Sequence, residues 1–335
     1  EMQRSLVGSE MCIRDSGNFN NEWGLPITIF EMNETHEVAI LEMGVNHFGE
    51  MRRLSSVASP DICVITNIGM AHLEFFKTRE GICQEKSQMI QDMKNGGTII
   101  LNGDDDILSG CGPIKGVAPQ FFGIGKNNEF YADNITSLGL KGTSCTIHLP
   151  SGECFNCTVP LPGAHMVSNA LSGAAVGYNL DLTSGEIKAG IEHLPSIPGR
   201  GAIISTDKLV ILDDCYNANP VSMKASMDVL DLAIGRKVAV LGDMGELGED
   251  ASRMHYETGA YASKKGIDLV CAIGTLGKEI AAGASDSGVK EVLWFETKAD
   301  FLAAAGEFLK DGDNVLVKAS HGMHLEEIVE ALQHL

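Results

Sequence analysis

The chain has 335 residues, of which 45 are Asp or Glu and 25 are Lys or Arg, so its formal net charge at pH 7 is −20. This acidic balance argues against general nucleic-acid binding and against attraction to an anionic membrane surface. No apolar run approaches the roughly 18 residues of a membrane-spanning helix, so we expect no membrane insertion. The length is enough for two domains of an α/β protein.

The nine cysteines are mostly scattered. Cys154 and Cys157 have C-x-x-C spacing, but they lie in a predicted strand, where residues three apart point to opposite faces. No second pair completes a zinc site, and we therefore interpret the spacing as chance. The pattern favours reduced thiols and a cytoplasmic location.

Residues 1–16 show no sustained hydrophobic period. Their string S-L-V-G-S-E-M-C-I-R-D-S is similar to a translated sequencing adapter. We predict that this segment is foreign to the fold or a disordered terminus, and we exclude it from the fold prediction.

Two apolar runs near the start predict buried strands, over residues 37–43 and 62–66. Glu42 closes the first, which is a usual place for a Mg²⁺ ligand, although a helix N-cap or a solvated edge would also explain it. The loop after the second carries His72. Ligands bind at the carboxyl ends of strands in open α/β sheets, so this loop is well placed for chemistry.

A helix is predicted over about residues 79–93, because Ile82, Met89 and Ile90 repeat with helical period. Lys86 lies on the same apolar stripe. A lysine there is unfavourable unless a partner holds it or chemistry alters it.

Short strands are predicted over 98–101 and 120–125, and the acidic run 102–106 is predicted to be a solvated turn rather than a metal site. Alternating residues from 131 to 159 predict a small antiparallel patch. The helix that follows carries His165 and Asn169 four residues apart on one face, which capping and core packing would explain equally well.

Residues 194–201 form the best candidate domain boundary, because two Pro and two Gly in eight residues interrupt any helix. Arg200 within this stretch is a guanidinium that could hold a phosphate. Beyond it, strands and helices alternate, which predicts a doubly wound, mostly parallel sheet. The polar strand ends 213–220, 242–248 and 318–324 are expected to gather at one sheet edge. The predicted strands are 209–212, 237–241, 269–273, 291–295 and 314–317, and the predicted helices are 220–232, 251–264, 276–284, 298–309 and 323–332.

Several stretches resemble one family, the Mur ligases. They include L-E-M-G-V-N-H-F-G-E, I-T-N-I-G-M-A-H-L-E, P-G-R, D-D-C-Y-N-A-N-P-V-S-M and L-G-D-M-G-E-L-G. The resemblance covers nearly all of 17–335. It implies an α/β fold, with a partial central P-loop-type ATPase domain over 17–197 and a Rossmann-like, doubly wound C-terminal domain over 198–335. The family's phosphate loop would precede Gly17, so the resemblance also implies that the chain alone is inactive.

The resemblance implies ATP-dependent amide-bond formation in peptidoglycan precursor synthesis, with ATP and Mg²⁺ as cofactors. The combination of Y-N-A-N-P and L-G-D-M-x-E-L-G is typical of the member that joins D-alanyl-D-alanine to UDP-N-acetylmuramoyl-tripeptide through an acyl phosphate. We expect a monomer. The alternatives are an inactive fragment of that ligase and a sibling amino-acid ligase such as folylpolyglutamate synthase.

The resemblance also implies roles for individual residues. Glu42 and His72 match Mg²⁺ ligands, and Lys86 matches a lysine that the family can carbamylate, so Lys86 and His72 are the implied catalytic residues. Asn169 and Arg200 match contacts to the adenine and to a phosphate of the nucleotide. The implied substrate-binding residues are Asn20, Asn21, Asn217 and Asn219. His321 stands where the family usually has Arg, which puts any charge role at that position in doubt.

Overall fold

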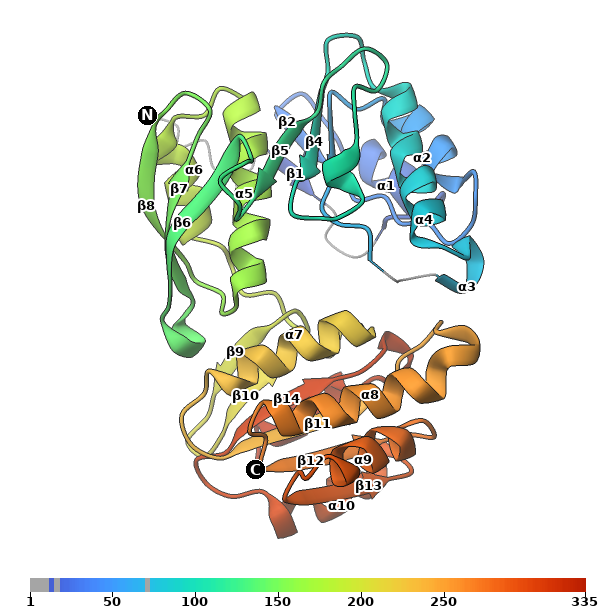
Figure 1. Ribbon diagram of the computed structural model, residues 1–335, viewed down its shortest axis with the longest axis vertical. Coiled ribbons are helices and arrows are strands. Elements are labelled where there is room, and N and C mark those ends of the chain that lie inside the picture. Colours follow the sequence, from blue (N-terminus) through green and yellow to red (C-terminus); the bar gives the residue numbers. More distant parts are fainter. Residues whose placement is uncertain (1–11, 15–18, 70–72) are drawn as a thin grey trace. The chain divides into compact units, whose positions relative to one another are not determined.

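The computed structural model describes residues 12–14, 19–69 and 73–335, which divide into two compact units. Unit 1 holds most of the chain as far as Pro195. Unit 2 holds Ser196–Leu335 together with Ser137–Gly142 and Leu161–Gly163. Figure 1 labels most of the elements of both. The change of unit at Ser196 falls within the stretch 194–201, while the functional domain boundaries themselves stay a prediction.

The described part of unit 1 contains a six-stranded sheet whose first four strands run parallel and whose last two pair antiparallel. This confirms the predicted mostly parallel sheet with a small antiparallel patch. Cys154 is exposed and Cys157 is buried, so the pair does point to opposite faces of its strand. In sheet order the strands are β3 (Ile62–Ile65), β4 (Thr98–Asn102), β5 (Gln120–Gly123), β6 (Phe130–Ser137), β7 (Thr143–His148) and β8 (Cys154–Val159).

The predicted helix over 79–93 is α-helical only as far as Lys86 and continues as the 3₁₀ turn Ser87–Asp92. Such tighter turns are common at helix C-termini. Ile82, Ile90 and Met93 nevertheless share one core with strands β3 and β4, as the apolar stripe predicted. The helices of unit 1 are α1 (Gly24–Phe30), α2 (Glu50–Ala58), α3 (Leu73–Phe76), α4 (Arg79–Lys86), α5 (Ala164–Asn179) and α6 (Ser184–Glu192).

The prediction of a buried strand over 37–43 was wrong in extent and in burial. Strand β2 covers only Val38–Ile40, and Ile40 is 42% exposed. Within the described residues, β2 pairs in parallel with β1 (Cys12–Arg14), and this pair stands outside the six-stranded sheet, which explains the exposure. The rest of the segment 1–16 lies outside the described residues, and its foreign origin stays a prediction.

Unit 2 is built on a sheet in which five neighbouring strands run parallel and an edge strand, β9, runs antiparallel to β10. The five parallel strands lie within one residue of their predicted bounds, whereas β9 was not predicted. In sheet order the strands are β13 (Glu291–Phe295), β12 (Leu269–Ile273), β11 (Lys237–Gly242), β14 (Asn314–Lys318), β10 (Val210–Asp213) and β9 (Ala202–Ser205).

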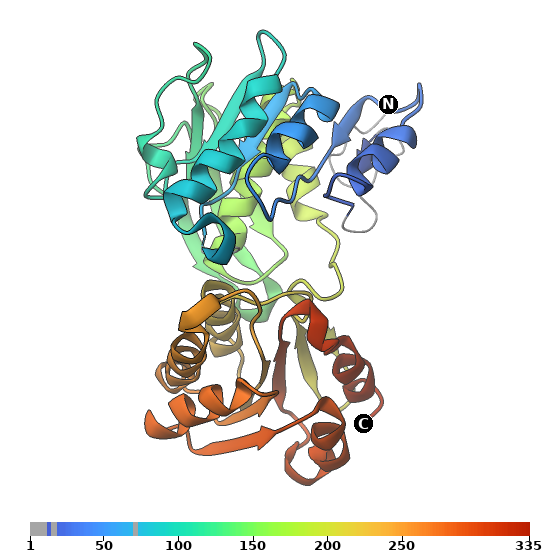
Figure 2. The ribbon, with the colours of Figure 1, turned by 90° about the vertical axis from the view of Figure 1, so that its right-hand side faces the viewer.

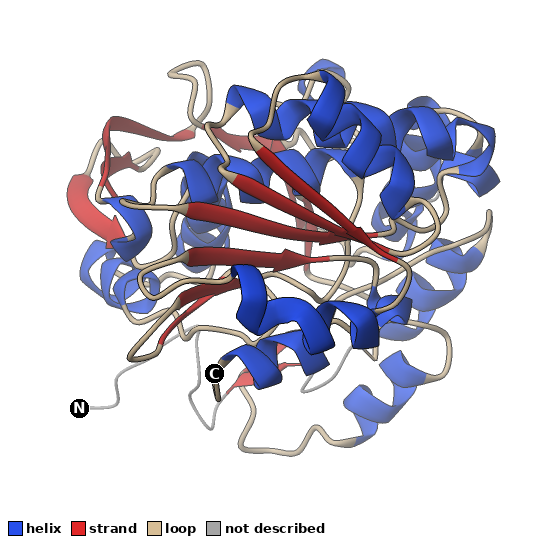
Figure 3. Cartoon of the chain, turned by 90° about the horizontal axis from the view of Figure 1, so that it is seen from below, coloured by secondary structure: helices blue, strands red, loops and turns tan. Residues whose placement is uncertain are grey.

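Helices cover both faces of this sheet (Figures 2 and 3), which confirms the doubly wound prediction. Successive residues of β11 alternate between two cores, since Val238 and Val240 pack on one face and Ala239 and Leu241 on the other. The first core contains residues of α10 and α11, and the second contains residues of α7, α8 and α9. Their bounds are α7 (Pro220–Asp231), α8 (Ala251–Lys264), α9 (Gly277–Asp286), α10 (Lys298–Phe308) and α11 (Glu326–Leu332).

Helices α8 and α9 pack through two glycines. A Cβ added at Gly259 would lie 1.9 Å from the carbonyl oxygen of Ile280, and one added at Gly283 would lie 2.0 Å from that of Tyr256. We predict that Gly259→Ala lowers the free energy of unfolding by about 1–3 kcal/mol, the usual effect of overpacking. Urea-induced unfolding measures this. Gly306→Ala in α10 is the control, because nothing lies within 4 Å of that position, and it should raise stability by up to about 1 kcal/mol.

Candidate active site

Lys86 ends helix α4 and points to the loop after strand β3. Its Nζ donates a hydrogen bond of 3.2 Å to the carbonyl oxygen of Asn67. The side chain is partly buried, and this burial lowers the pKa of the amine, while the charge of Asp105 acts in the opposite direction. A lowered pKa leaves more of the amine neutral at a given pH, and the neutral form is the nucleophile.

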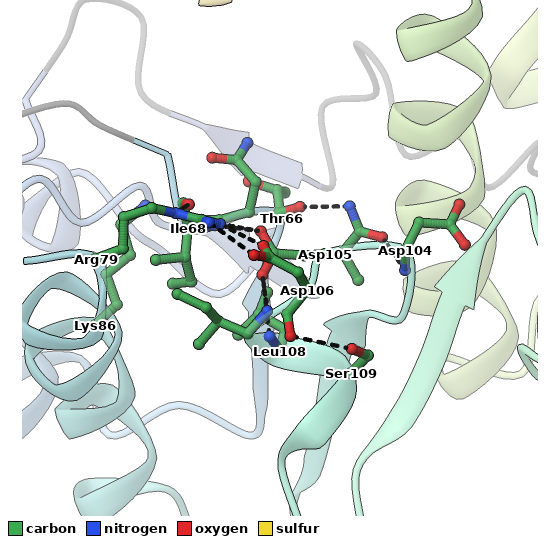
Figure 4. Close-up of polar contacts among 12 residues, drawn as sticks. Thr66, Ile68, Arg79, Lys86, Asp104, Asp105, Asp106, Leu108 and Ser109 are labelled. Atoms are coloured by element: carbon green, nitrogen blue, oxygen red, sulfur yellow. Dashed lines mark hydrogen bonds and ion pairs between the residues drawn. The ribbon is translucent and has the colours of Figure 1, made fainter.

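The loop that carries Asn67 is held by Arg79 and by the acidic run after β4 (Figure 4). Arg79 donates from Nε to the carbonyl oxygen of Ile68 at 2.9 Å, and its two terminal nitrogens pair with both oxygens of Asp106. Asp105 accepts the backbone N–H of Ile68 at 2.8 Å. The loop therefore presents the Asn67 carbonyl to Lys86 from a fixed position.

The acidic run forms a turn, as predicted, but it is not solvated throughout, because the Asp105 side chain is only 7% exposed. Asp105 also accepts the N–H groups of Ile107 and Leu108, and Asp104 accepts those of Ile124 and Gly125. In the part of the chain that the structure describes, no group of three or more His, Cys, Asp and Glu side chains could hold a metal ion.

Sequence reasoning missed Glu85, which is the fully buried charged residue of α4. Its two carboxylate oxygens accept the N–H groups of Gly49 and Met51, both at 2.9 Å, at the start of helix α2. A carboxylate at a helix N-terminus satisfies donors that have no partner within the helix. Helix α4 thus directs Glu85 to α2 and Lys86 to Asn67. The sequence signal that could have revealed Glu85 was its place next to Lys86, on a helix that carries an apolar stripe.

The structure brings Asn20 and Glu42 together. The amide of Asn20 donates to Oε1 of the exposed Glu42 at 3.1 Å, and the carbonyl oxygen of Asn20 accepts the N–H of Gly44. Asn21 instead accepts the N–H groups of Trp23 and Gly24, at the start of α1. His72 lies outside the described residues.

The donor chemistry of Glu42 fits a magnesium ion. Mg²⁺ in nucleotide sites keeps several waters and needs one or two carboxylates besides the phosphates. Glu42 offers an exposed carboxylate just beyond the end of β2. Asn169, the predicted adenine contact, is exposed on α5, where its amide lies 3.6 Å from the sulfur of Met166.

In unit 2, the three polar strand ends do gather at one edge of the sheet. Lys318 ends β14, and its Nζ donates to the carboxylate of Asp214 at 2.6 Å and to the carbonyl oxygen of Asn217 at 3.0 Å. The hydroxyl of Ser320 donates to the carbonyl oxygen of Asp243 and accepts the N–H of Gly245. These contacts tie the loops after β10, β11 and β14 together.

Two predicted substrate-binding residues lie on the loop after β10. Asn217 is exposed, and its carboxamide oxygen accepts the N–H of Ala218. Asn219 is the N-cap of α7 and forms a capping box with Ser222. Arg200, the predicted phosphate contact, lies with its Cζ 4.1 Å from the centroid of the Tyr216 ring. The ligand contacts of these residues stay predictions.

A second residue that the sequence did not reveal is His255 of α8, which is completely buried. Its Nε2 accepts the N–H of Met244 at 2.8 Å, and its Nδ1 lies 2.6 Å from the carbonyl oxygen of Ala251. Because a carbonyl can only accept, Nδ1 carries the proton in this arrangement. The neutral imidazole fixes the loop after β11.

Comparison with known proteins gives matches along almost the whole chain. Residues 3–177 match the Mur ligase middle domain, and residues 199–321 match the Mur ligase, glutamate ligase domain. A UDP-N-acetylmuramoyl-tripeptide--D-alanyl-D-alanine ligase from Bacillus subtilis (strain 168) is 37% identical over 337 residues, covering 99% of this chain and 72% of the relative. The protein of the same name from Escherichia coli (strain K12) is 33% identical, covering 95% and 70%.

Solved structures of MurF proteins also match this chain along nearly its whole length. MurF from Acinetobacter baumannii superposes with a TM-score of 0.86 at 29% identity, covering 97% of this chain and 70% of that one. MurF from Thermotoga maritima in complex with ADP gives 0.85 at 26% identity, covering 98% and 74%. FolC from E. coli, in complex with DHPP and ADP, gives 0.69 at 20% identity over 93% of this chain and 71% of that one, a likeness of fold alone.

Proposed function

Because this chain belongs to the Mur ligase family, we propose that it is an ATP-dependent ligase that joins D-alanyl-D-alanine to UDP-N-acetylmuramoyl-tripeptide. The observation that carries this function is the identity of 33–37% along nearly the whole chain to proteins named for that reaction. The reaction forms a C–N bond in the synthesis of a peptidoglycan precursor.

We propose the following chemical course. The terminal carboxylate of the tripeptide attacks the γ-phosphorus of ATP, which forms an acyl phosphate and releases ADP. The amine of D-alanyl-D-alanine then attacks the acyl carbon, an amide bond forms, phosphate leaves, and the amine loses a proton. Positioning and charge neutralisation dominate phosphoryl transfer, and Mg²⁺ supplies part of that neutralisation when bound. Glu42 would hold the metal through its carboxylate, and His72 is proposed as a second ligand and as a catalytic residue.

Lys86 is proposed to act as a carbamate. Its neutral amine adds to CO₂, a C–N bond forms, and a proton is released, so that a cation becomes an anion. The lowered pKa of Lys86 supports this step, because burial favours the neutral amine that the reaction requires. The contact to the Asn67 carbonyl also supports it, since the side chain is held in one direction.

The remaining contacts are proposals of the same kind. Asn169 is proposed to contact the adenine and Arg200 a phosphate, and the exposure of both side chains leaves them accessible. Asn217 on its exposed loop is proposed to face the dipeptide. In Asn219 and Asn21 the carboxamide oxygen accepts a capping hydrogen bond, so the amide nitrogen is the group that remains for a substrate. Asn20 is the fourth proposed substrate-binding residue.

We further propose that the protein works in the cytoplasm as a monomer. The acidic charge supports the absence of a nucleic-acid partner. None of the described helices is long and apolar enough to cross a membrane.

A panel of amine acceptors tests the proposed function against a sibling ligase. For this and the other activity assays the chain is joined at Gly17 to the phosphate-loop segment of a relative, since the family resemblance implies that the chain alone is inactive. ADP release is measured with UDP-N-acetylmuramoyl-tripeptide and D-alanyl-D-alanine, L-glutamate or a diamino acid as acceptor. We expect kcat/KM for D-alanyl-D-alanine to exceed the others by at least about 100-fold, because a site built to hydrogen-bond one substrate rejects analogues strongly. A preference for L-glutamate, with a folate in place of the UDP-sugar, would point to the sibling activity instead.

A further inference from the structure

We propose that Tyr216 is a positioning residue that holds the guanidinium of Arg200 ready to bind an anion. This inference rests on the proposed function, in which that anion is a phosphate of the nucleotide. The two residues belong to separate stretches of unit 2, the segment that leads into β9 and the loop that follows β10.

The backbone fixes the two residues relative to each other. The N–H of Gly199 donates to the buried carboxylate of Asp213 at 2.7 Å, and the carbonyl oxygen of Gly199 accepts the N–H of Tyr216 at 3.0 Å. Gly199 has a φ of 75°, and a Cβ added there would lie 3.2 Å from the Cβ of Tyr216. The close approach therefore depends on a residue without a side chain, and it sets Arg200 directly against Tyr216.

The guanidinium of Arg200 lies over the Tyr216 ring. The Cζ of Arg200 lies 4.1 Å from the centroid of the Tyr216 ring, well within cation–π range. Stacking occupies the flat face of a guanidinium and leaves its N–H groups directed outward around the rim, where they can bind a phosphate with two parallel hydrogen bonds. Arg200 is exposed, so its side chain is accessible to a ligand from solvent.

Arg200 differs from the other arginines whose side chains the structure describes. Each of those pairs with a carboxylate, as expected in a chain with 45 acidic and 25 basic residues. Among the described residues, Arg200 has no such ion pair, and its contact is the aromatic ring. A cation held in place without an internal counter-ion is suited to an external anion. The paired arginines are Arg52, Arg53, Arg79, Arg236 and Arg253.

The test compares four variants of the full chain: Arg200→Gln, Tyr216→Phe, Tyr216→Leu and Lys290→Gln. ADP with Mg²⁺ is titrated by calorimetry. We expect Arg200→Gln to weaken ADP binding by about tenfold, since a charge-assisted hydrogen bond contributes about 1.5 kcal/mol or more. Tyr216→Leu should weaken it by roughly two- to fivefold, the range of an exposed cation–π contact. Tyr216→Phe keeps the ring and should bind as the unaltered chain does, as should Lys290→Gln, which changes a lysine exposed to 82%.

A second measurement follows the arginine directly. In NMR spectra of chain labelled in its arginine side chains, the Arg200 signals should be shifted by the ring current of Tyr216. The shift should disappear in Tyr216→Leu and persist in Tyr216→Phe. A general loosening of unit 2 would also alter the signals of Arg236 and Arg253, whereas loss of the stack alone would leave them unchanged.

The outcomes separate the inference from the function on which it rests. If Arg200→Gln weakens ADP binding and Tyr216→Leu does not, the positioning role of Tyr216 is overturned while the phosphate contact stands. Unchanged binding in Arg200→Gln, or no binding of ADP by the unaltered chain, contradicts the proposed nucleotide contact. Arg200 signals that do not respond to Tyr216→Leu overturn the stack itself.

Discussion

Replacing Lys86 with alanine is expected to lower kcat for ligation by at least about 100-fold, the loss typical when a preorganised charged group is removed from an active site. The effect should be this large because the loop after β3 and helix α4 hold the amine in one direction, through the Asn67 carbonyl. A side chain whose position is fixed in this way is not replaced by water or by a neighbouring lysine. Steady-state ADP release with both substrates measures the change.

Lys94→Ala is the matched control, because Lys94 is exposed and its ion pair among the described residues is with the surface carboxylate of Asp61. Surface pairs contribute little, so its activity should be unchanged. A carbon NMR spectrum in ¹³C-bicarbonate adds a direct test, since a carbamate carbon should be present in the unaltered chain and absent from Lys86→Ala. More than a tenth of the activity remaining in Lys86→Ala would remove Lys86 from the catalytic residues.

Replacing Lys318 with methionine is expected to lower the free energy of unfolding by about 3 kcal/mol, at the lower end of the range for breaking a buried ion pair. The Lys318 side chain is 3% exposed, while that of its partner Asp214 is 25% exposed, so water can partly solvate the carboxylate left behind. The carbonyl oxygen of Asn217 loses its donor as well. Chemical denaturation with a fluorescence readout measures the loss.

The double variant Lys318→Met with Asp214→Asn should recover part of this stability, because no charge then remains without its partner. Lys290→Met is the control, since its pairing with Asp268 is a surface contact of 3.5 Å, and it should change stability by less than about 0.5 kcal/mol. A loss below 1 kcal/mol in Lys318→Met would show that the loops after β10 and β14 do not depend on this ion pair.

The architecture of unit 2 could be predicted from sequence because its signals are local. Strand β12 is a continuous apolar run, and β13 is apolar after its first residue, Glu291. Helical patterns separate such strands along the chain, and this alternation is typical of parallel sheets. The gathering of the three polar strand ends followed from that topology alone. Helix α11 begins at Glu326 rather than at 323, because His321–Met323 forms a 3₁₀ turn, and the ends of helices are the least predictable from sequence.

The details of the candidate site could not be predicted from sequence, because they depend on tertiary contacts that hydrophobic periodicity does not reveal. The apolar stripe placed Lys86 toward the core, but the fully buried charge is Glu85, because helix α2 offers it two N–H groups. The exposure of β2 follows from its pairing outside the main sheet. Arg200 meets Tyr216 where the N–H of Gly199 donates to Asp213, and Gly199 and Asp213 are 14 positions apart with no local pattern to connect them.

The most direct test of the ligase account is detection of its product. The chain, joined at Gly17 to the phosphate-loop segment of a relative, is incubated with ATP, Mg²⁺, UDP-N-acetylmuramoyl-tripeptide and D-alanyl-D-alanine. The UDP-sugar fraction is then analysed by mass spectrometry together with ADP. The account predicts a UDP-N-acetylmuramoyl-pentapeptide, formed in equal amount to ADP and absent when either ATP or the dipeptide is left out. ADP binding with no pentapeptide formed would contradict the ligase account and favour a chain that folds and binds nucleotide without ligation.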